Sequence, residues 1–251
     1  MKILAGGCRV YSADDGRSAV HGTWSARTLM ERTTGARLIT QAINEYRPGA
    51  APPVRNSKAE EVLYVVSGHG TCRLGGYDYP LASGTALFIP PRTWYAIDNP
   101  GPEPLRTVSA CCPEDPSREI GGAEITSERG SPPVRTVRES EREEIRAGKD
   151  RVFRYLAYTD IGCRTVTQFV GWIPESKAPF HHHTYEEGIY ILDGQGLLHI
   201  QGESSPTPFG AGMSIYFPAG VVHCLENPGP QPIRVLGVFH PSGSPGVAYE
   251  E

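Results

Sequence analysis

One residue pattern occurs twice in this chain, and that repeat limits the folds open to it more than any other feature. The first copy reads R-x-S-x-x-x-E from Arg55 to Glu61, and the second reads H-x-H-x-x-x-E from His181 to Glu187. A glycine follows seven residues after each glutamate. A second segment keeps its internal spacing in both copies, namely Gly84, Pro90, Arg92, Tyr95 and Asn99, then Gly212, Pro218, Gly220, His223 and Asn227. The chain should therefore build one fold twice.

Short apolar runs surround these anchors, and the 29 glycines and 23 prolines gather at the breaks between them. The turn N-P-G-P occurs at 99–102 and again at 227–230. Many short strands with such turns predict an all-β protein of two small antiparallel barrels. We expect a first unit over residues 1–113, a linker over 114–150 and a second unit over 151–251. The charged stretch 137–148 could form one short helix within that linker.

The composition excludes several classes of protein. A net charge of −4 without a basic stripe argues against nucleic acid as a partner. No apolar run approaches the length of a membrane span, and the stretch before Cys8 is too short for a signal peptide. We therefore expect a cytoplasmic protein. The six cysteines form no C-x-x-C pair, so buried free thiols are expected, Cys224 among them.

Four side chains of the second copy have the chemistry of metal ligands. His181 and His183 should share one face of an extended segment, since side chains at i and i+2 point the same way. Together with Glu187 and His223 they would form a cage suited to a divalent transition metal. An ion that prefers six ligands would keep two positions open, as catalytic rather than structural sites do. The competing interpretation is a barrel with ordinary core histidines.

In the first copy the same positions carry Arg55, Ser57, Glu61 and Tyr95, so a transition metal is not expected there. We expect Arg55 and Glu61 to form a buried ion pair with a structural role. The alternative is an anion pocket built from Arg55, Ser57 and Tyr95.

Three further residues are candidates for a role beside the metal. His199 could act as a base, or it could be an ordinary histidine of the barrel. Gln168 and Arg164 share a strand parity, so both could face the cavity. Arg164 would then clamp a substrate carboxylate through two hydrogen bonds, unless it faces solvent. His182 should point outward.

The joint pattern H-x-H-x3-E-x6-G and G-x5-P-x-G-x2-H-x3-N resembles both conserved motifs of the cupin family. It departs from them only where Glu175 replaces the glycine usually found ahead of the first histidine. The resemblance extends over nearly the whole chain as a two-cupin arrangement. It implies one jelly-roll (double-stranded β-helix) barrel in each half. It also implies one metal ion, inside the second barrel: manganese or iron in most similar proteins, and nickel, cobalt, copper or zinc in others.

Three classes of function fit a cupin with these ligands, and each involves a small-molecule substrate or ligand. The first, which we favour from the sequence, is an oxidoreductase of the dioxygenase type. The second is redox-neutral metal catalysis by an isomerase, a decarboxylase or an aminohydrolase. The third is a non-catalytic small-molecule-binding protein. A monomer and a homodimer are both compatible with the sequence.

Overall fold

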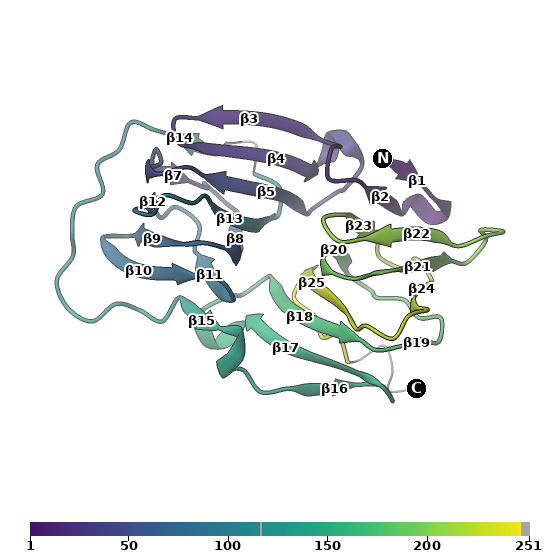
Figure 1. The fold of residues 1–251 in the computed structure, drawn as a ribbon. Helices are drawn as coiled ribbons and strands as arrows, with labels where there is room; N and C mark the ends of the chain where they lie inside the picture. Colours follow the sequence, from purple (N-terminus) through teal and green to yellow (C-terminus); the bar gives the residue numbers. More distant parts are fainter. Residues whose placement is uncertain (116, 247–251) are drawn as a thin grey trace.

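The structure is a computed structural model that describes residues 1–115 and 117–246. It consists of two β-barrels side by side, which confirms the all-β, two-barrel architecture (Figure 1). The helices of the described residues are four single 3-10 turns, namely η1 (Ala5–Gly7), η2 (Arg32–Thr34), η3 (Glu139–Glu141) and η4 (Thr159–Ile161). Within the same residues, no helix has the length and apolar character needed to cross a membrane.

The first barrel is made of two antiparallel sheets that face each other. One sheet has the order β15 (Thr136–Arg138), β11 (Thr85–Ile89), β8 (Glu60–Ser67), β13 (Leu105–Cys112), β5 (Thr40–Tyr46), β4 (Trp24–Met30) and β3 (Arg17–His21). The other has the order β10 (Tyr77–Ala82), β9 (His69–Leu74), β12 (Tyr95–Asn99), β7 (Val54–Arg55) and β14 (Glu119–Ile120), and β6 (Gly49–Ala50) also pairs with β12.

The second barrel repeats this plan. Its larger sheet has the order β1 (Lys2–Ile3), β2 (Arg9–Tyr11), β23 (Ser214–Phe217), β20 (Glu186–Asp193), β25 (Ile233–His240), β18 (Thr167–Ile173), β17 (Arg151–Ala157) and β16 (Ile145–Ala147). Its smaller sheet has the order β19 (Ser176–Lys177), β24 (His223–Asn227), β21 (Gln195–Ile200) and β22 (Thr207–Gly210).

The strand pairing follows the sequence repeat. Strand β8 carries Glu61 and lies between β11 and β13, and β20 carries Glu187 and lies between β23 and β25. Alternation of burial along a strand decides which side chains reach the barrel interior. On β21, for example, Leu198 and Ile200 are buried while His199 between them is partly exposed. The repeat therefore places the two glutamates at equivalent positions inside the two barrels.

Each barrel also receives strands from the chain segment that precedes the other barrel, as β2 and β15 illustrate. Strand β2 lies before the first barrel in sequence but pairs with β23 of the second. Strand β15 lies before the second barrel but pairs with β11 of the first. These additions cover edges that would otherwise expose unpaired backbone groups. In the charged stretch 137–148, where one short helix was expected, the helical part is the single turn η3, and β15 and β16 lie on either side of it.

Two buried glutamates tie the barrels together, one from each side. The Glu60 carboxylate accepts hydrogen bonds from the backbone N–H groups of Arg164, at 3.0 Å, and Thr165, at 2.9 Å. The Glu186 carboxylate accepts one from the backbone N–H of Leu38 at 2.9 Å. In each Glu-Glu pair the first residue therefore serves the interface and the second points into its own barrel.

Candidate metal centre

The structure brings the four predicted ligands together inside the second barrel. His181 and His183 lie in the segment between β19 and β20, Glu187 is on β20, and His223 begins β24. The ligand nitrogens of the three histidines all lie within 4.8 Å of one another. One carboxylate oxygen of Glu187, Oε2, is 3.7 Å from His183 Nε2 and 3.6 Å from His223 Nε2. Side chains distant in sequence thus converge on one point.

Backbone hydrogen bonds hold the segment that carries His181 beside the first residue of β24. The N–H of His181 donates to the carbonyl of His223 at 3.0 Å, and the N–H of His223 donates back to the carbonyl of His181 at 2.8 Å. The segment from His181 to His183 is therefore held by an isolated bridge rather than by the regular strand we expected. The two side chains nevertheless both line the cavity.

Two of the imidazoles are oriented by hydrogen bonds at Nδ1. His223 Nδ1 is 2.9 Å from the carbonyl oxygen of Val221, and His181 Nδ1 is 3.2 Å from that of Pro179. A carbonyl oxygen can only accept, so the proton of each ring lies on Nδ1 and the lone pair on Nε2. Such fixed tautomers are the usual condition of metal-ligating histidines.

Burial makes this group of side chains favourable for a cation. It lowers the pKa of His183 to about 3, and it lowers the pKa values of His181 and His223 as well. It raises the pKa of Glu187 to about 8. Glu187 Oε2 is buried and has no hydrogen-bond partner. The three imidazoles are neutral and Glu187 Oε2 has no partner, so this group of side chains contains no positive charge. A divalent metal would supply that charge.

The ligands face a narrow cavity of about 70 Å³ with largely apolar walls. Phe153, Phe169 and Phe239 form part of these walls. A wider depression of about 830 Å³ lies outside the cavity and shares four of its lining residues, which are Ala147, Arg151, His181 and His183. The site is therefore a small chamber with mostly apolar walls that opens at the barrel mouth.

Arg151, the first residue of β17, is a cavity residue that no sequence motif indicates. Its side chain is only 7% exposed and lines the cavity together with the three histidines. Nη2 donates to the backbone carbonyl of Leu225 at 2.7 Å. In the sequence Arg151 follows Lys149 and Asp150 and reads as part of a solvated charged turn. Only the β16–β17 hairpin turns it inward.

The three side chains expected beside the metal lie elsewhere. Arg164 is exposed and precedes β18, so it does not share the strand of Gln168 as we expected. Gln168 is buried on the face of β18 opposite Phe169, which lines the cavity, and pairs across to Val238 in the layer between the barrels. His199 Nε2 lies 2.5 Å from Glu226 Oε2, and His199 does not line the cavity. Exposed His182 lies at the mouth.

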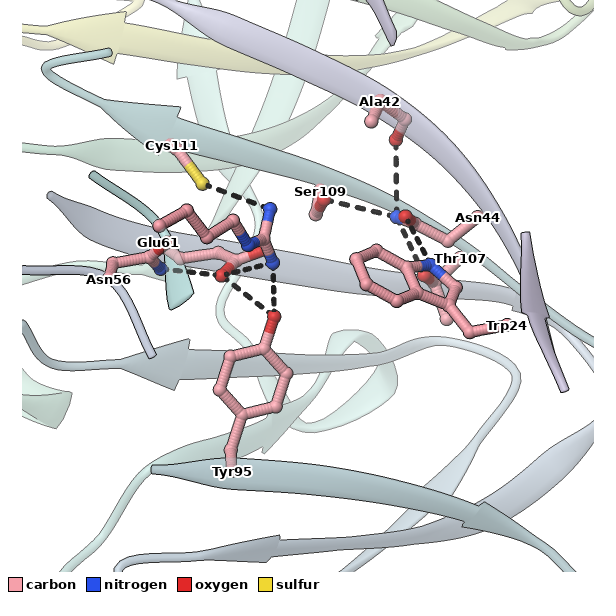
Figure 2. Close-up of polar contacts among 10 residues, drawn as sticks. Trp24, Ala42, Asn44, Asn56, Glu61, Tyr95, Thr107, Ser109 and Cys111 are labelled. Atoms are coloured by element: carbon pink, nitrogen blue, oxygen red, sulfur yellow. Dashed lines mark hydrogen bonds and ion pairs between the residues drawn. The ribbon is translucent and has the colours of Figure 1, made fainter. Parts of the chain in front are cut away.

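The first barrel fills the equivalent position with its own cation. Arg118 Nη2 donates to both carboxylate oxygens of Glu61 at 3.1 Å. The hydroxyl of Tyr95 donates to Glu61 at 2.9 Å and the amide of Asn56 at 2.7 Å. Figure 2 shows both groups directed at the Glu61 carboxylate, with Cys111 nearby. Glu61 thus has four hydrogen bonds from three side chains, where Glu187 Oε2 has none.

The expected pairing of Arg55 in the first barrel was wrong. Arg55 Nη2 lies 2.7 Å from Glu119 Oε1 and its guanidinium lies over the ring of Trp94. The hydroxyl of Ser57 donates to Asp115. Arg55 and Ser57 therefore form neither an ion pair with Glu61 nor an anion pocket with Tyr95. The ion-pair partner of Glu61 is Arg118, which lies in the connector between the barrels. Arg118 is not part of the repeated motifs, so the motifs do not predict this pair.

A family model described as "Cupin domain" matches residues 42–111 and 169–239, which are equivalent parts of the two barrels. An uncharacterised protein of Methanocaldococcus jannaschii is 37% identical over 67 residues, which are 26% of this chain and 52% of that protein. The mannose-1-phosphate guanylyltransferase ManC of Salmonella typhimurium is 40% identical over 58 residues, which are 23% of this chain and 12% of that enzyme. The matches thus cover about half of one curated relative and a small part of the other.

Two solved structures share the arrangement of nearly the whole chain. The Escherichia coli protein Ylba superimposes with a TM-score of 0.74 at 17% identity, over 95% of this chain and 93% of that one. An R92A mutant of the Bacillus subtilis oxalate decarboxylase superimposes with a TM-score of 0.76 at 16% identity, over 94% of this chain and 78% of that one. At such identities the likeness concerns the fold.

Proposed function

Because this chain belongs to the cupin family, we propose that its second barrel is the active site of a metal-dependent enzyme acting on a small organic molecule. His181, His183, Glu187 and His223 would hold the ion. The observation that carries the proposal is the buried, unpartnered Oε2 of Glu187 beside two of three clustered imidazoles. A buried carboxylate in that state is unfavourable unless a cation binds it.

Manganese or iron is the proposed ion, because three imidazoles and one carboxylate suit a first-row divalent metal. Nickel, cobalt, copper or zinc would also accept this set. When bound, the metal supplies a Lewis acid with open positions for substrate. The chain itself holds the imidazole tautomers in place through Val221 and Pro179, and it limits water through the phenylalanine walls.

The first candidate reaction is redox-neutral cleavage of the decarboxylase type. One support is the fold that this chain shares with an oxalate decarboxylase. The other is the apolar chamber, which removes water from a charged carboxylate and is compatible with the neutral product CO₂. The second candidate is the dioxygenase reaction that we favoured from the sequence. The same apolar walls would admit O₂. Cytoplasmic location, a monomer or homodimer, and the unit limits remain predictions.

Metal analysis and gas measurements test the proposal. The purified protein should contain about one divalent transition metal per chain, and Glu187→Gln should lose most of it. Small organic acids, oxalate included, should then be screened with and without O₂. Release of CO₂ without O₂ supports the decarboxylase, and O₂ consumption coupled to substrate supports the dioxygenase. A wild-type protein that binds no metal after incubation with manganese, iron or zinc would contradict both.

A further inference from the structure

Arg151 places a buried positive charge beside the proposed metal site without a close acidic partner. The nearest carboxylate oxygen, Asp150 Oδ1, is 3.7 Å from Arg151 Nε, and the Asp150 side chain is 42% exposed. Arg151 Nε itself is buried and has no hydrogen-bond partner. A buried charge without a close partner is unfavourable. A negatively charged group bound in the chamber would offset that cost.

The guanidinium is held toward the chamber by the same strand that carries a proposed ligand. Its Nη2 donates to the carbonyl of Leu225, two residues after His223 on β24. Arg151 lines both the inner cavity and the wide depression at the mouth. It therefore stands where a molecule entering from the mouth would reach the three imidazoles.

The charges around the chamber favour an anion. Glu187 is the single acidic side chain among the described residues that line the inner cavity, and Arg151 is the single basic one. With a divalent ion bound, the chamber would hold two positive charges in excess. In a site with apolar walls such an excess strongly favours a negatively charged ligand.

We propose that Arg151 binds a carboxylate group of the substrate, so that the enzyme acts on a small carboxylic acid. The unpartnered Nε would donate to a carboxylate oxygen, and the planar guanidinium suits such a group better than an ammonium does. An inner chamber of about 70 Å³ has room for the carboxylate and few further atoms, and a larger remainder would lie in the mouth. This inference rests on the proposed function and assigns to Arg151 the role first expected of Arg164.

Matched acids and amides test this assignment by binding rather than by turnover. Manganese-loaded protein is titrated calorimetrically with glycolate, lactate and pyruvate, and with the neutral analogues glycolamide and lactamide. We expect the acids to bind and the amides to bind at least 10-fold more weakly. Arg151→Gln should weaken acid binding by about 30- to 100-fold, as loss of a hydrogen bond between charged groups does. Metal content, measured by mass spectrometry, should stay at the wild-type level.

Two further variants separate recognition from a purely structural role. Arg151→Lys keeps the charge and should retain part of the acid affinity. Arg146→Gln, an exposed arginine on the neighbouring strand β16, should leave both affinities unchanged. Arg151→Gln with unchanged preference for acids over amides would overturn the inference, and so would wild-type protein that binds none of the acids at 10 mM. Loss of metal from wild-type protein would instead count against the proposed function, and the acids would then be titrated into the metal-free protein.

Discussion

The two barrels carry a glutamate at the same strand position but satisfy it in different ways. In the first barrel Glu61 is 1% exposed and receives hydrogen bonds from Arg118, Tyr95 and Asn56. In the second, Glu187 is 4% exposed and its Oε2 has no hydrogen bond. A carboxylate at this depth needs positive charge, and one barrel supplies it from its own connector. The comparison therefore supports the proposal that an external ion binds in the second barrel and not in the first.

The neighbouring glutamates show what the barrels have kept in common. Glu60 and Glu186 precede the two interior glutamates, and both accept backbone hydrogen bonds from the opposite barrel. This role needs only a carboxylate and backbone N–H groups, so it does not depend on which side chains line the interior. The two barrels thus differ at their centres and share this interface contact.

The largest expected effect comes from removing one proposed ligand. His223→Ala should lower metal affinity by at least about 100-fold, since even changes in groups that only orient a ligand cost about 10- to 100-fold. Metal content after dialysis, measured by mass spectrometry, checks this. Tyr95→Phe changes the equivalent position of the first barrel and should leave metal content unchanged. Equal metal loss in the two variants would show that the barrels do not differ as described.

Removing the internal cation of the first barrel should destabilise the protein without affecting the metal. Arg118→Met leaves Glu61 buried without its ion-pair partner. Breaking a buried pair costs about 3–5 kcal/mol, and the Arg118 side chain is 23% exposed, so we expect a loss of roughly 3 kcal/mol in the free energy of unfolding.

Urea denaturation checks the loss of stability, with Arg106→Met as the matched control. Arg106 pairs with Glu45 at the surface, with side chains 59% and 38% exposed, and should contribute less than about 1 kcal/mol. An Arg118 variant as stable as this control would mean that Glu61 does not need its guanidinium partner. The metal content of both variants should match the wild type.

The pH dependence of the metal-free protein should reveal Glu187. Its pKa is about 8 in the folded chain against the ordinary value of 4.5, so the native state holds a proton that the unfolded chain releases. Its stabilising contribution is full below about pH 4.5 and is lost as pH rises through 8. The histidines have lowered pKa values, so their contribution is instead complete above pH 6.5 and is lost as pH falls.

Between pH 6.5 and 8, therefore, the Glu187 contribution falls while the unfolded chain's histidines lose their last protons, so the glutamate is isolated by comparison with Glu187→Gln. Relative to that variant, the metal-free protein should lose about 2 kcal/mol of stability over this interval, because each unit of pKa difference corresponds to about 1.4 kcal/mol. Calorimetry of the two proteins in the presence of a chelator measures this difference. Metal binding at pH 7 should release about one proton, detected by titration in two buffers. Binding without proton release would contradict the raised pKa.

The repeat allowed the sequence to predict much of the fold and the grouping of the four metal-ligand candidates. The spacing of the repeated residues is read directly from the sequence. The strand pairing around β8 and β20 follows the same repeat. The exchange of β2 and β15 between barrels was not predictable, because pairing of strand edges depends on which edges lie exposed after both barrels form. Nothing near 9–11 or 136–138 records that geometry.

The failed predictions and the missed residues have two causes. Arg164 and Gln168 were placed by strand parity, but β18 begins at Thr167, so parity did not extend to Arg164. Arg118 and Arg151 lie outside the repeated motifs, and their inward direction follows from the connector and from a hairpin. From sequence alone, a charged residue in a polar stretch is expected to be exposed to solvent. Only the tertiary structure shows that Arg118 and Arg151 point inward.

The smallest expected effect concerns Arg55, which stands where the second barrel has His181. Its ion pair with Glu119 is partly exposed, at 34% and 46% for the two side chains, and such pairs contribute about 0–1 kcal/mol. Arg55→Ala should therefore change the unfolding free energy by less than about 1 kcal/mol and leave metal content unchanged. Chemical denaturation and metal analysis check both values. Loss of the ion in this variant would mean that the two barrels share one centre, since no contact of Arg55 described in the structure reaches the second barrel.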